Sequence, residues 1–208
     1  MENFGFSSNF APEIIKKIKM MGNKKNAEDF GVQATSSTLP VNSLARNYLP
    51  ADYVDMFGAE VHDDERLTPD NLLIAVWTDF PKWVQMLFKL RDWLVKPFGL
   101  KTNANGKDFR HKLAEAIRSG GRVQLMNVLA KSANETVVQL ADTHLTAEMS
   151  VHTEKSNGNQ TKINFITIVH FHNVLGKIYF FFAQPFHKII VKAAMKQSIK
   201  KLLENRDR

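Results

Sequence analysis

The stretch from Gln160 to Met195 constrains the fold more than any other part of the chain. Its first half, QTKINFITIVHFHN, is the best strand pattern in the sequence, rich in β-branched and aromatic residues. Its second half, VLGKIYFFFAQPFHKIIVKAAM, is the longest helical pattern. Because almost no loop separates the two halves, we expect a sheet that grips the last helix of the chain.

Length and composition narrow the class of protein. The 208 residues suit one domain with an appended arm. The absence of cysteine excludes disulfides, thiol catalysis and thiolate metal sites, and it is compatible with the cytoplasm, which is the location we expect. The first residues, MENFGFSSNF, lack the features of a secretory signal, and the most apolar run, residues 174–183, is too short to cross a bilayer.

Positive charge is concentrated at the C-terminal end. The formal net charge is +7, and residues 174–208 hold eight Lys or Arg against two Asp or Glu. We interpret the regular spacing of four lysines as a solvated helix face rather than a site for an anionic surface. No aromatic residues interleave with them to stack bases, so nucleic acid is not expected as a partner. These lysines, at i, i+4 spacing, are Lys188, Lys192, Lys196 and Lys200.

The first 38 residues are predicted to be a poorly ordered arm, and residues 39–208 to be the folded domain. The arm is polar and broken by glycine, as in the segment GNKKNAEDFG. Within it, residues 12–21 could form a short amphipathic helix that begins at Pro12. We expect this helix to dock onto its own domain rather than onto a membrane surface.

The folded domain is predicted to begin with an edge strand and to continue with helices. The strand covers residues 53–61, and a short helix capped by Thr68 follows it. A second helix is expected over residues 81–100, and a weaker helical pattern lies in residues 103–121. Four strands complete the sheet, over residues 122–131, 135–141, 144–153 and 160–172.

The helix expected over residues 81–100 is apolar nearly all round, yet it carries Arg91 among apolar neighbours. A buried arginine needs either an anionic partner or a path along which its stem reaches water. Two interpretations therefore stay open. Arg91 could form an internal ion pair or snorkel to the surface, or it could hold the carboxylate or phosphate of a ligand.

The turn at residues 156–158 predicts the register of the last two strands. A three-residue loop with Gly158 in the left-handed conformation pairs Lys155 with Asn159. The apolar residues then gather on one face, whereas a slip of one residue would scatter them. The predicted inner face comprises Met126, Val128, Val138, Leu140, Leu145, Ala147, Met149, Val151, Ile163, Phe165, Thr167 and Val169. The predicted outer face comprises His144, Glu148, His152, Asn164, Ile166, Ile168, His170 and His172.

The last helix is expected to start near Val174. Pro185 lies inside its pattern, so we expect either a kink there or a short helix followed by a second one. The stripe predicted to face the sheet comprises Ile178, Phe182, Phe186, Ile189, Ile190 and Ala193.

Four stretches of the chain resemble a known family. They are LPADYVD at 49–55, PKWVQMLFKLRDWLVKPFGL at 81–100, ADTHLTAEMSV at 141–151 and VHFHNVLGKIYFFFAQPFHKIIV at 169–191. The last is the most specific, because its histidines, Asn173, Gly176 and the run Pro185-Phe186-His187 fall in the family's order. From about residue 39 onward the chain is similar to domain-of-unknown-function family 2867, which is placed in the START-like, or helix-grip, superfamily.

The resemblance implies an α+β fold in which a curved antiparallel sheet wraps around a long C-terminal helix, with a cavity between them. Some members carry this domain behind a nicotinamide-dinucleotide-binding domain. This sequence has no glycine-rich fingerprint for such a cofactor, because neither GKDFRH nor SGGR opens a helix directly after a strand. We therefore assign no cofactor. The first 38 residues and the segment 103–118 depart from the family's pattern.

A metal site has little support from the sequence. In the predicted register His144 faces His170, and His172 faces Asp142, a set that could hold zinc or iron. The set lies on the outer face, however, and cross-strand polar pairs are common in sheets. We assign no metal.

Catalytic residues are equally unsupported. Ser150 and Thr167 have no obvious base on their own face of the sheet, as nucleophilic catalysis would require. Glu148 and His144 point the same way and could act as acid and base, but isolated polar side chains on a sheet are usually solvated. We assign no catalytic residue.

The leading hypothesis is a protein that binds a hydrophobic small molecule or lipid in a cavity between the sheet and the last helix. Each residue of the predicted lining could instead fill a dry core. Two alternatives stay open: a cyclase- or isomerase-like enzyme that uses the same cavity, and an accessory module that docks on a separate NAD(P)-dependent reductase. An enzyme of this kind needs an ionisable group inside the cavity, and Arg91 is the main candidate that the sequence offers. An enzymatic role is therefore the less favoured one. The predicted lining comprises Trp83, Met149, Phe165, Thr167 and Phe182, with Arg91 as the anchor.

Overall fold

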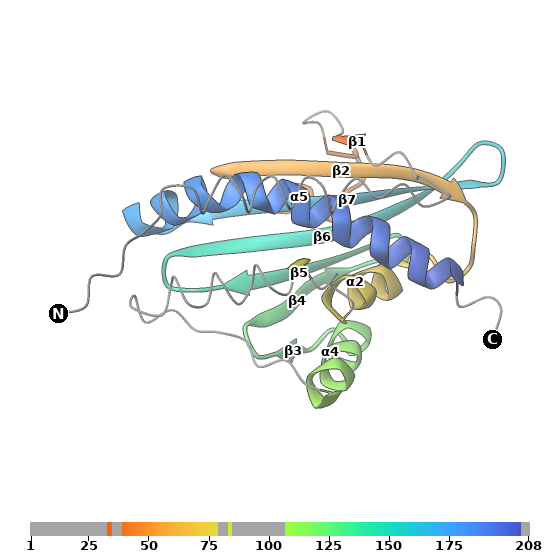
Figure 1. Cartoon of the computed structure of the whole chain (residues 1–208), viewed down its shortest axis with the longest axis horizontal. Coiled ribbons are helices and arrows are strands. Elements are labelled where there is room, and N and C mark those ends of the chain that lie inside the picture. The colour runs from red at the N-terminus through yellow and green to blue at the C-terminus, as the bar shows by residue number, and fades with distance from the viewer. Residues whose placement is uncertain (1–32, 35–38, 79–82, 85–106, 205–208) are drawn as a thin grey trace.

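The structure is a computed structural model of the whole chain, and it describes residues 33–34, 39–78, 83–84 and 107–204. The described residues form a curved antiparallel sheet and a long C-terminal helix that lies across it (Figure 1). The predicted α+β fold of the helix-grip kind is therefore confirmed. The strand order is β1-β2-β7-β6-β5-β4-β3, with every neighbouring pair antiparallel.

The element boundaries follow the predicted ones closely in most of the chain. The strands are β1 (Gln33–Ala34), β2 (Tyr53–His62), β3 (Arg122–Val123), β4 (Met126–Lys131), β5 (Glu135–Ala141), β6 (Leu145–Ser156) and β7 (Gln160–Phe171). The helices are the 3-10 helix η1 (Leu44–Tyr48) and the α-helices α2 (Pro69–Thr78), α4 (Lys107–Ser119) and α5 (Val174–Glu204).

Three predicted segments differ from the structure or fall outside it. The strand predicted over residues 122–131 is two strands, because Gln124 has a positive φ of 51° and turns the chain between β3 and β4. Of the predicted arm, residues 33–34 are described, and they pair with β2 as β1. The helix expected at residues 12–21 lies outside the described residues, as does most of the helix expected at 81–100.

The β6–β7 hairpin has a register two residues away from the predicted one. Ser156 pairs with Gln160, and two consecutive loop residues, Gly158 and Asn159, have positive φ values of 75° and 60°. The predicted pairing of Lys155 with Asn159 is therefore wrong. Because side chains alternate with a period of two, a shift of two leaves every residue on its predicted face.

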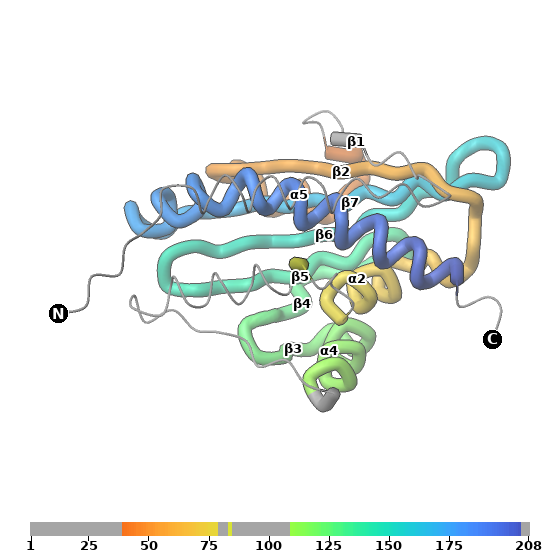
Figure 2. Tube along the Cα trace, viewed as in Figure 1, coloured from red at the N-terminus to blue at the C-terminus, as the bar shows by residue number. Residues whose placement is uncertain are grey.

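The two faces of the sheet have different covers. On the inner face, α2, α4 and the second half of α5 enclose the main core around Phe57, Ile163 and Phe165. On the outer face, η1 and the residues beside it cover a smaller core around Ile166 and Ile168. The trace in Figure 2 shows β2 running beside β7, although the two strands lie far apart in the sequence.

The side chain of Asn173 fixes the start of α5 directly after β7. The Asn173 side chain caps the helix, since its Oδ1 accepts from the backbone N–H of Gly176 at 3.0 Å and its Nδ2 donates to the Thr143 carbonyl at 3.3 Å. α5 is one helix of 31 residues with Pro185 inside it. The alternative of two separate helices is therefore wrong.

The side of α5 that faces the sheet is not the predicted one. Phe180 is buried and packs on Tyr53, with 4.7 Å between ring centroids. Ile178 and Phe182, expected in the inner stripe, are exposed. The first half of α5 is apolar on several sides, as FFF at 180–182 illustrates, so periodicity alone could not select the side that packs.

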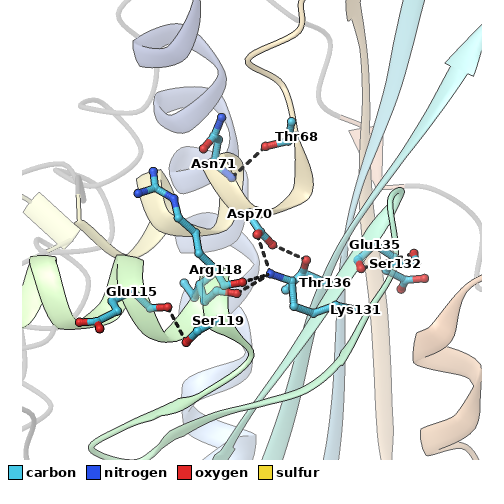
Figure 3. Close-up of polar contacts among 11 residues, drawn as sticks. Thr68, Asp70, Asn71, Glu115, Arg118, Ser119, Lys131, Ser132, Glu135 and Thr136 are labelled. Atoms are coloured by element: carbon cyan, nitrogen blue, oxygen red, sulfur yellow. Dashed lines mark hydrogen bonds and ion pairs between the residues drawn. The ribbon is translucent and has the colours of Figure 1, made fainter.

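A charged node fastens α2 and α4 to the sheet (Figure 3). Lys131 Nζ lies 2.6 Å from Asp70 Oδ2 and donates to the carbonyl oxygens of Ile117 at 2.6 Å and Arg118 at 3.0 Å. Asp70 Oδ1 accepts from Thr136 Oγ1 at 2.6 Å. Because a cation at a helix C-terminus satisfies carbonyls that have no partner within the helix, this node is structural.

Candidate functional site

Five inner-face residues lie in one row across the sheet, one on each of five neighbouring strands. Thr167 on β7 pairs with Asp55 on β2 on one side and with Met149 on β6 on the other. Val138 on β5 and Val128 on β4 continue the row. The row is therefore polar on β2 and β7, where Asp55 and Thr167 lie, and apolar on β6, β5 and β4.

The polar end of the row belongs to a group of three side chains, Tyr53, Asp55 and His187. Tyr53 donates its hydroxyl hydrogen to Asp55 Oδ2 at 2.6 Å. His187, on α5, places Nε2 3.3 Å from Asp55 Oδ2 and 3.4 Å from Oδ1. The Asp55 carboxylate thus joins β2, the strand next to the edge strand β1, to the middle of α5, and its side chain is 11% exposed.

The surroundings of Tyr53 favour its neutral form. Burial raises the pKa of Tyr53 well above its ordinary value, and the hydrogen bond and negative charge of Asp55 raise it further. A side-chain hydrogen bond with Gln184 acts in the opposite direction. Tyr53 therefore stays a protonated hydrogen-bond donor held by Asp55, with the Phe180 ring packed against it.

Beside this group the inner face is apolar and is not fully buried. Phe165 and Val169 are buried, whereas several apolar side chains farther from β2 are only half-buried. Apolar surface left accessible on the concave side of a sheet is suited to contact with an apolar ligand. The half-buried residues are Val128, Leu140, Leu145, Ala147 and Met149.

The predicted lining residues separate into three groups. Met149, Phe165 and Thr167 lie together on the inner face, with Met149 half-buried and the other two buried. Trp83 is half-buried, next to the fully buried Val84. Phe182 is 66% exposed on the opposite side of α5, so its predicted inward position is wrong. Arg91 lies outside the described residues.

A separate hollow lies on α4. It has a volume of about 550 Å³ and is lined by His111, Ala114, Glu115, Arg118 and Ser119. The lining residues that the structure describes all belong to α4, and none of the six predicted site residues is among them.

The match with one protein family covers the inner-face residues described above. The family described as protein of unknown function (DUF2867) matches residues 48–194. The chain belongs to this family. Tyr53, Asp55 and His187 all lie within the DUF2867 match, as do Met149, Phe165 and Thr167. No curated protein sequence matches the chain.

The outer face of this DUF2867 domain carries buried polar groups that serve the fold. Glu135 is 1% exposed, and its carboxylate accepts from the backbone N–H groups of Leu44 at 2.5 Å and Ala45 at 3.3 Å. It also accepts from the hydroxyls of Ser43 and Ser150. Glu135 therefore caps the start of η1 and holds it on the sheet.

Two outer-face histidines, His170 and His172, have different side-chain neighbours. His172 Nε2 lies 2.9 Å from Thr146 Oγ1, and His170 Nε2 lies 3.5 Å from Glu148 Oε2. His144 pairs through its backbone with His172, which corrects the predicted pairing with His170. Over the described ranges, no three His, Asp or Glu side chains form a group suited to a metal ion.

Sequence reasoning missed Tyr53, Asp55 and His187. A signal was present, because Asp55 sits at alternate spacing between Tyr53 and Phe57 on a strand whose inner side is apolar. A carboxylate on such a face needs a partner. Its partner His187 lies more than a hundred positions later in the sequence, where no local pattern identifies it.

No helix among the described residues is long and apolar enough to span a membrane.

Proposed function

We propose that this DUF2867 domain binds a small molecule or lipid that has an apolar body and one polar end group. The ligand lies between the inner face of the sheet and the first half of α5. The observation that carries the proposal is accessible apolar surface, at residues such as Ala147 and Met149, beside the Tyr53–Asp55–His187 group. Covering such surface contributes roughly 25 cal/mol per Å² to binding.

The resemblance to the START-like, helix-grip superfamily supports the same location, since the cavity that it implies lies between the sheet and the C-terminal helix. The Tyr53–Asp55–His187 group supplies a carboxylate acceptor, an imidazole and a phenol to a polar end group such as a hydroxyl. Arg91 remains our proposed anchor for ligands that end in a carboxylate or a phosphate. Few polar groups on a mostly apolar surface are typical of such sites.

The test combines native mass spectrometry of protein purified from cells with thermal shift against a panel of fatty acids, sterols and aromatic compounds. A ligand at 100 times its Kd stabilises the folded state by about 2.7 kcal/mol. For a domain of this size that raises Tm by roughly 5–10 °C. We expect a co-purifying apolar mass, or a shift of that order with one class of compound.

Two matched variants locate the binding site. Ala147→Trp places an indole on the accessible part of the inner face and is expected to abolish the shift without unfolding the protein. Glu154→Trp introduces the same indole at an exposed position of the same strand and should leave the shift intact. No co-purifying mass together with no shift, or equal shifts in both variants, would contradict the proposal.

A second candidate function follows from the Tyr53–Asp55–His187 contacts. A carboxylate held between a phenol and an imidazole can move protons, as a cyclase- or isomerase-like enzyme needs. Once a ligand is identified, its conversion would be followed by mass spectrometry with wild type and with Asp55→Asn. Turnover that Asp55→Asn reduces about 100-fold or more supports the enzyme, whereas an unchanged ligand supports binding alone.

A further inference from the structure

The outward side of α5 carries an exposed apolar stripe. Among the described residues, seven large hydrophobic side chains are exposed, and five of them lie in the first three turns of α5. Phe181 is 72% exposed, and its ring meets that of Phe182 edge-on at 5.4 Å between centroids. The five residues, called here the outer stripe, are Val174, Leu175, Ile178, Phe181 and Phe182.

The spacing of these residues shows that they form one surface. Val174, Ile178 and Phe182 recur at i, i+4 and i+8, which places them on one side of the helix. The opposite side bears Phe180 and His187, which contact the sheet. Among the residues that the structure describes, the side of α5 with the outer stripe does not face the sheet, across which α5 runs in Figure 1, so the stripe can meet another surface while α5 keeps its packing.

The charge around the outer stripe is entirely positive along the helix. Residues 174–203 contain six lysines and no Asp or Glu. Lys177 and Lys188 are exposed and lie on the same line of the helix surface as Phe181, at i, i+4 and i+11. Exposed lysines continue along the second half of α5 at positions 196 and 200. The partner of this surface must therefore accept apolar side chains and positive charge together.

We propose that the outer stripe docks on a membrane surface that contains anionic lipid. Phe181, Phe182 and Ile178 enter the boundary between headgroups and acyl chains, while Lys177 and Lys188 reach the lipid phosphates. The helix lies in the plane of the interface rather than crossing the bilayer. A second copy of the chain fits this surface less well, because pairing two such helices places lysines opposite lysines.

The test is co-sedimentation of the full chain with vesicles of phosphatidylcholine alone or with about one third phosphatidylserine, at about 0.1 M salt. Wild type is expected to bind the anionic vesicles and to lose most of this binding at about 1 M salt. The double variant Phe181→Ser with Phe182→Ser should bind them at least about tenfold more weakly. Lys177→Gln and Lys188→Gln should each weaken binding roughly fivefold on anionic vesicles only.

Matched controls distinguish docking through the outer stripe from non-specific adsorption to vesicles. Val41→Ser removes the most exposed apolar side chain away from α5, and Arg110→Gln removes an exposed cation on α4. Both should bind as wild type does. Every altered residue is exposed, and circular dichroism with a thermal melt verifies that each variant is folded.

Three results would overturn the proposal. Wild type could fail to sediment with anionic vesicles, or the double phenylalanine variant could bind as tightly as wild type. Sedimentation equilibrium could instead reveal a dimer that the double phenylalanine variant dissociates, which would make a second copy the occupant. The ligand test of the inner face uses other residues, so its outcome is independent of this one.

Discussion

Gly176 sets the distance between the start of α5 and the sheet. A Cβ atom built at this position would lie 2.1 Å from the carbonyl oxygen of His144 and 3.0 Å from its carbonyl carbon. Both atoms belong to the backbone, so no side-chain rotation relieves the contact. The helix can begin directly after β7, and touch the chain before β6, only because residue 176 has no side chain.

Gly176→Ala is therefore expected to destabilise the protein. Alanine favours a helix by about 1 kcal/mol over glycine, but displacing backbone in a packed contact costs about 1–3 kcal/mol or more. Because the contact of 2.1 Å places the cost at the upper end of this range, we expect a net loss of about 2 kcal/mol in the free energy of unfolding, measured by urea denaturation. Gly121→Ala is the control, since its nearest atom is the flexible Ser119 Oγ at 3.3 Å. Equal stability of the two variants would contradict this account.

The contact among Tyr53, Asp55 and His187 is the feature at the residue scale that could not be predicted from the sequence. Asp55 was visible as an acid on an apolar strand face, and His187 as part of a family motif. Their contact depends on how α5 rotates over β2, which is set by packing of Phe180 on Tyr53. Arrangements of this kind come from tertiary contacts and leave no periodic trace in the sequence.

At the scale of elements, the alternation of side chains was predictable and the exact pairing was not. Val151, Phe165 and Thr167 lie on the predicted inner face because side chains alternate with a period of two, so a shift of two residues leaves each on the same face. The register itself depends on backbone conformation in the β6–β7 loop. The sequence NGN at 157–159 permits left-handed residues at more than one position, so turn chemistry left the pairing undetermined.

Substitutions in that loop test the observed turn. Asn159 has a φ of 60°, which asparagine tolerates and a β-branched residue does not. Asn159→Val should lower the free energy of unfolding by about 1–2 kcal/mol, whereas Asn159→Gly should change it little. Asn157→Val, at an exposed neighbour with ordinary φ, serves as the control. If the two valine variants are equally stable in urea denaturation, the described turn is incorrect.

At the scale of the whole molecule, ionisable groups tie distant parts of the sheet together. Asp63, after β2, accepts hydrogen bonds from Lys155 and Thr161 of the β6–β7 hairpin, and these lower its pKa. Burial raises the pKa of Tyr48, the last residue of η1, and the negative charges of Glu148 and Glu135 raise it further. The pKa of Tyr53 is raised as well. Folding is therefore linked to pH at both ends of the scale.

Stability is expected to fall at both acid and alkaline pH. A lowered pKa at Asp63 stabilises the fold above the unfolded value of about 4, and this contribution disappears as the pH falls. Raised pKa values at Tyr48 and Tyr53 stabilise it below the unfolded value of about 10, and this contribution is lost as the pH rises. The urea midpoint, measured from acid to alkaline pH, should fall at low pH (the acid limb) and again at high pH (the alkaline limb).

Single substitutions assign the two limbs. Asp63→Asn should flatten the acid limb relative to wild type, and Tyr53→Phe should flatten the alkaline one. Tyr179→Phe removes a phenol that lies against His144 rather than beside Asp55, and it serves as the alkaline control. An alkaline limb that Tyr53→Phe leaves as steep as in wild type would show that Tyr53 does not carry it.

The adjacency of β2 and β7 has a consequence for how the protein is made. Tyr53 pairs with Val169, so β2 leaves the ribosome long before its partner has been synthesised. At translation rates of roughly 5–20 residues per second, the interval is roughly 6–20 seconds. During that time β2 has no β7 strand with which to pair. Completion of this sheet is therefore a late event in the life of the polypeptide, and chaperones have a defined interval in which to protect it.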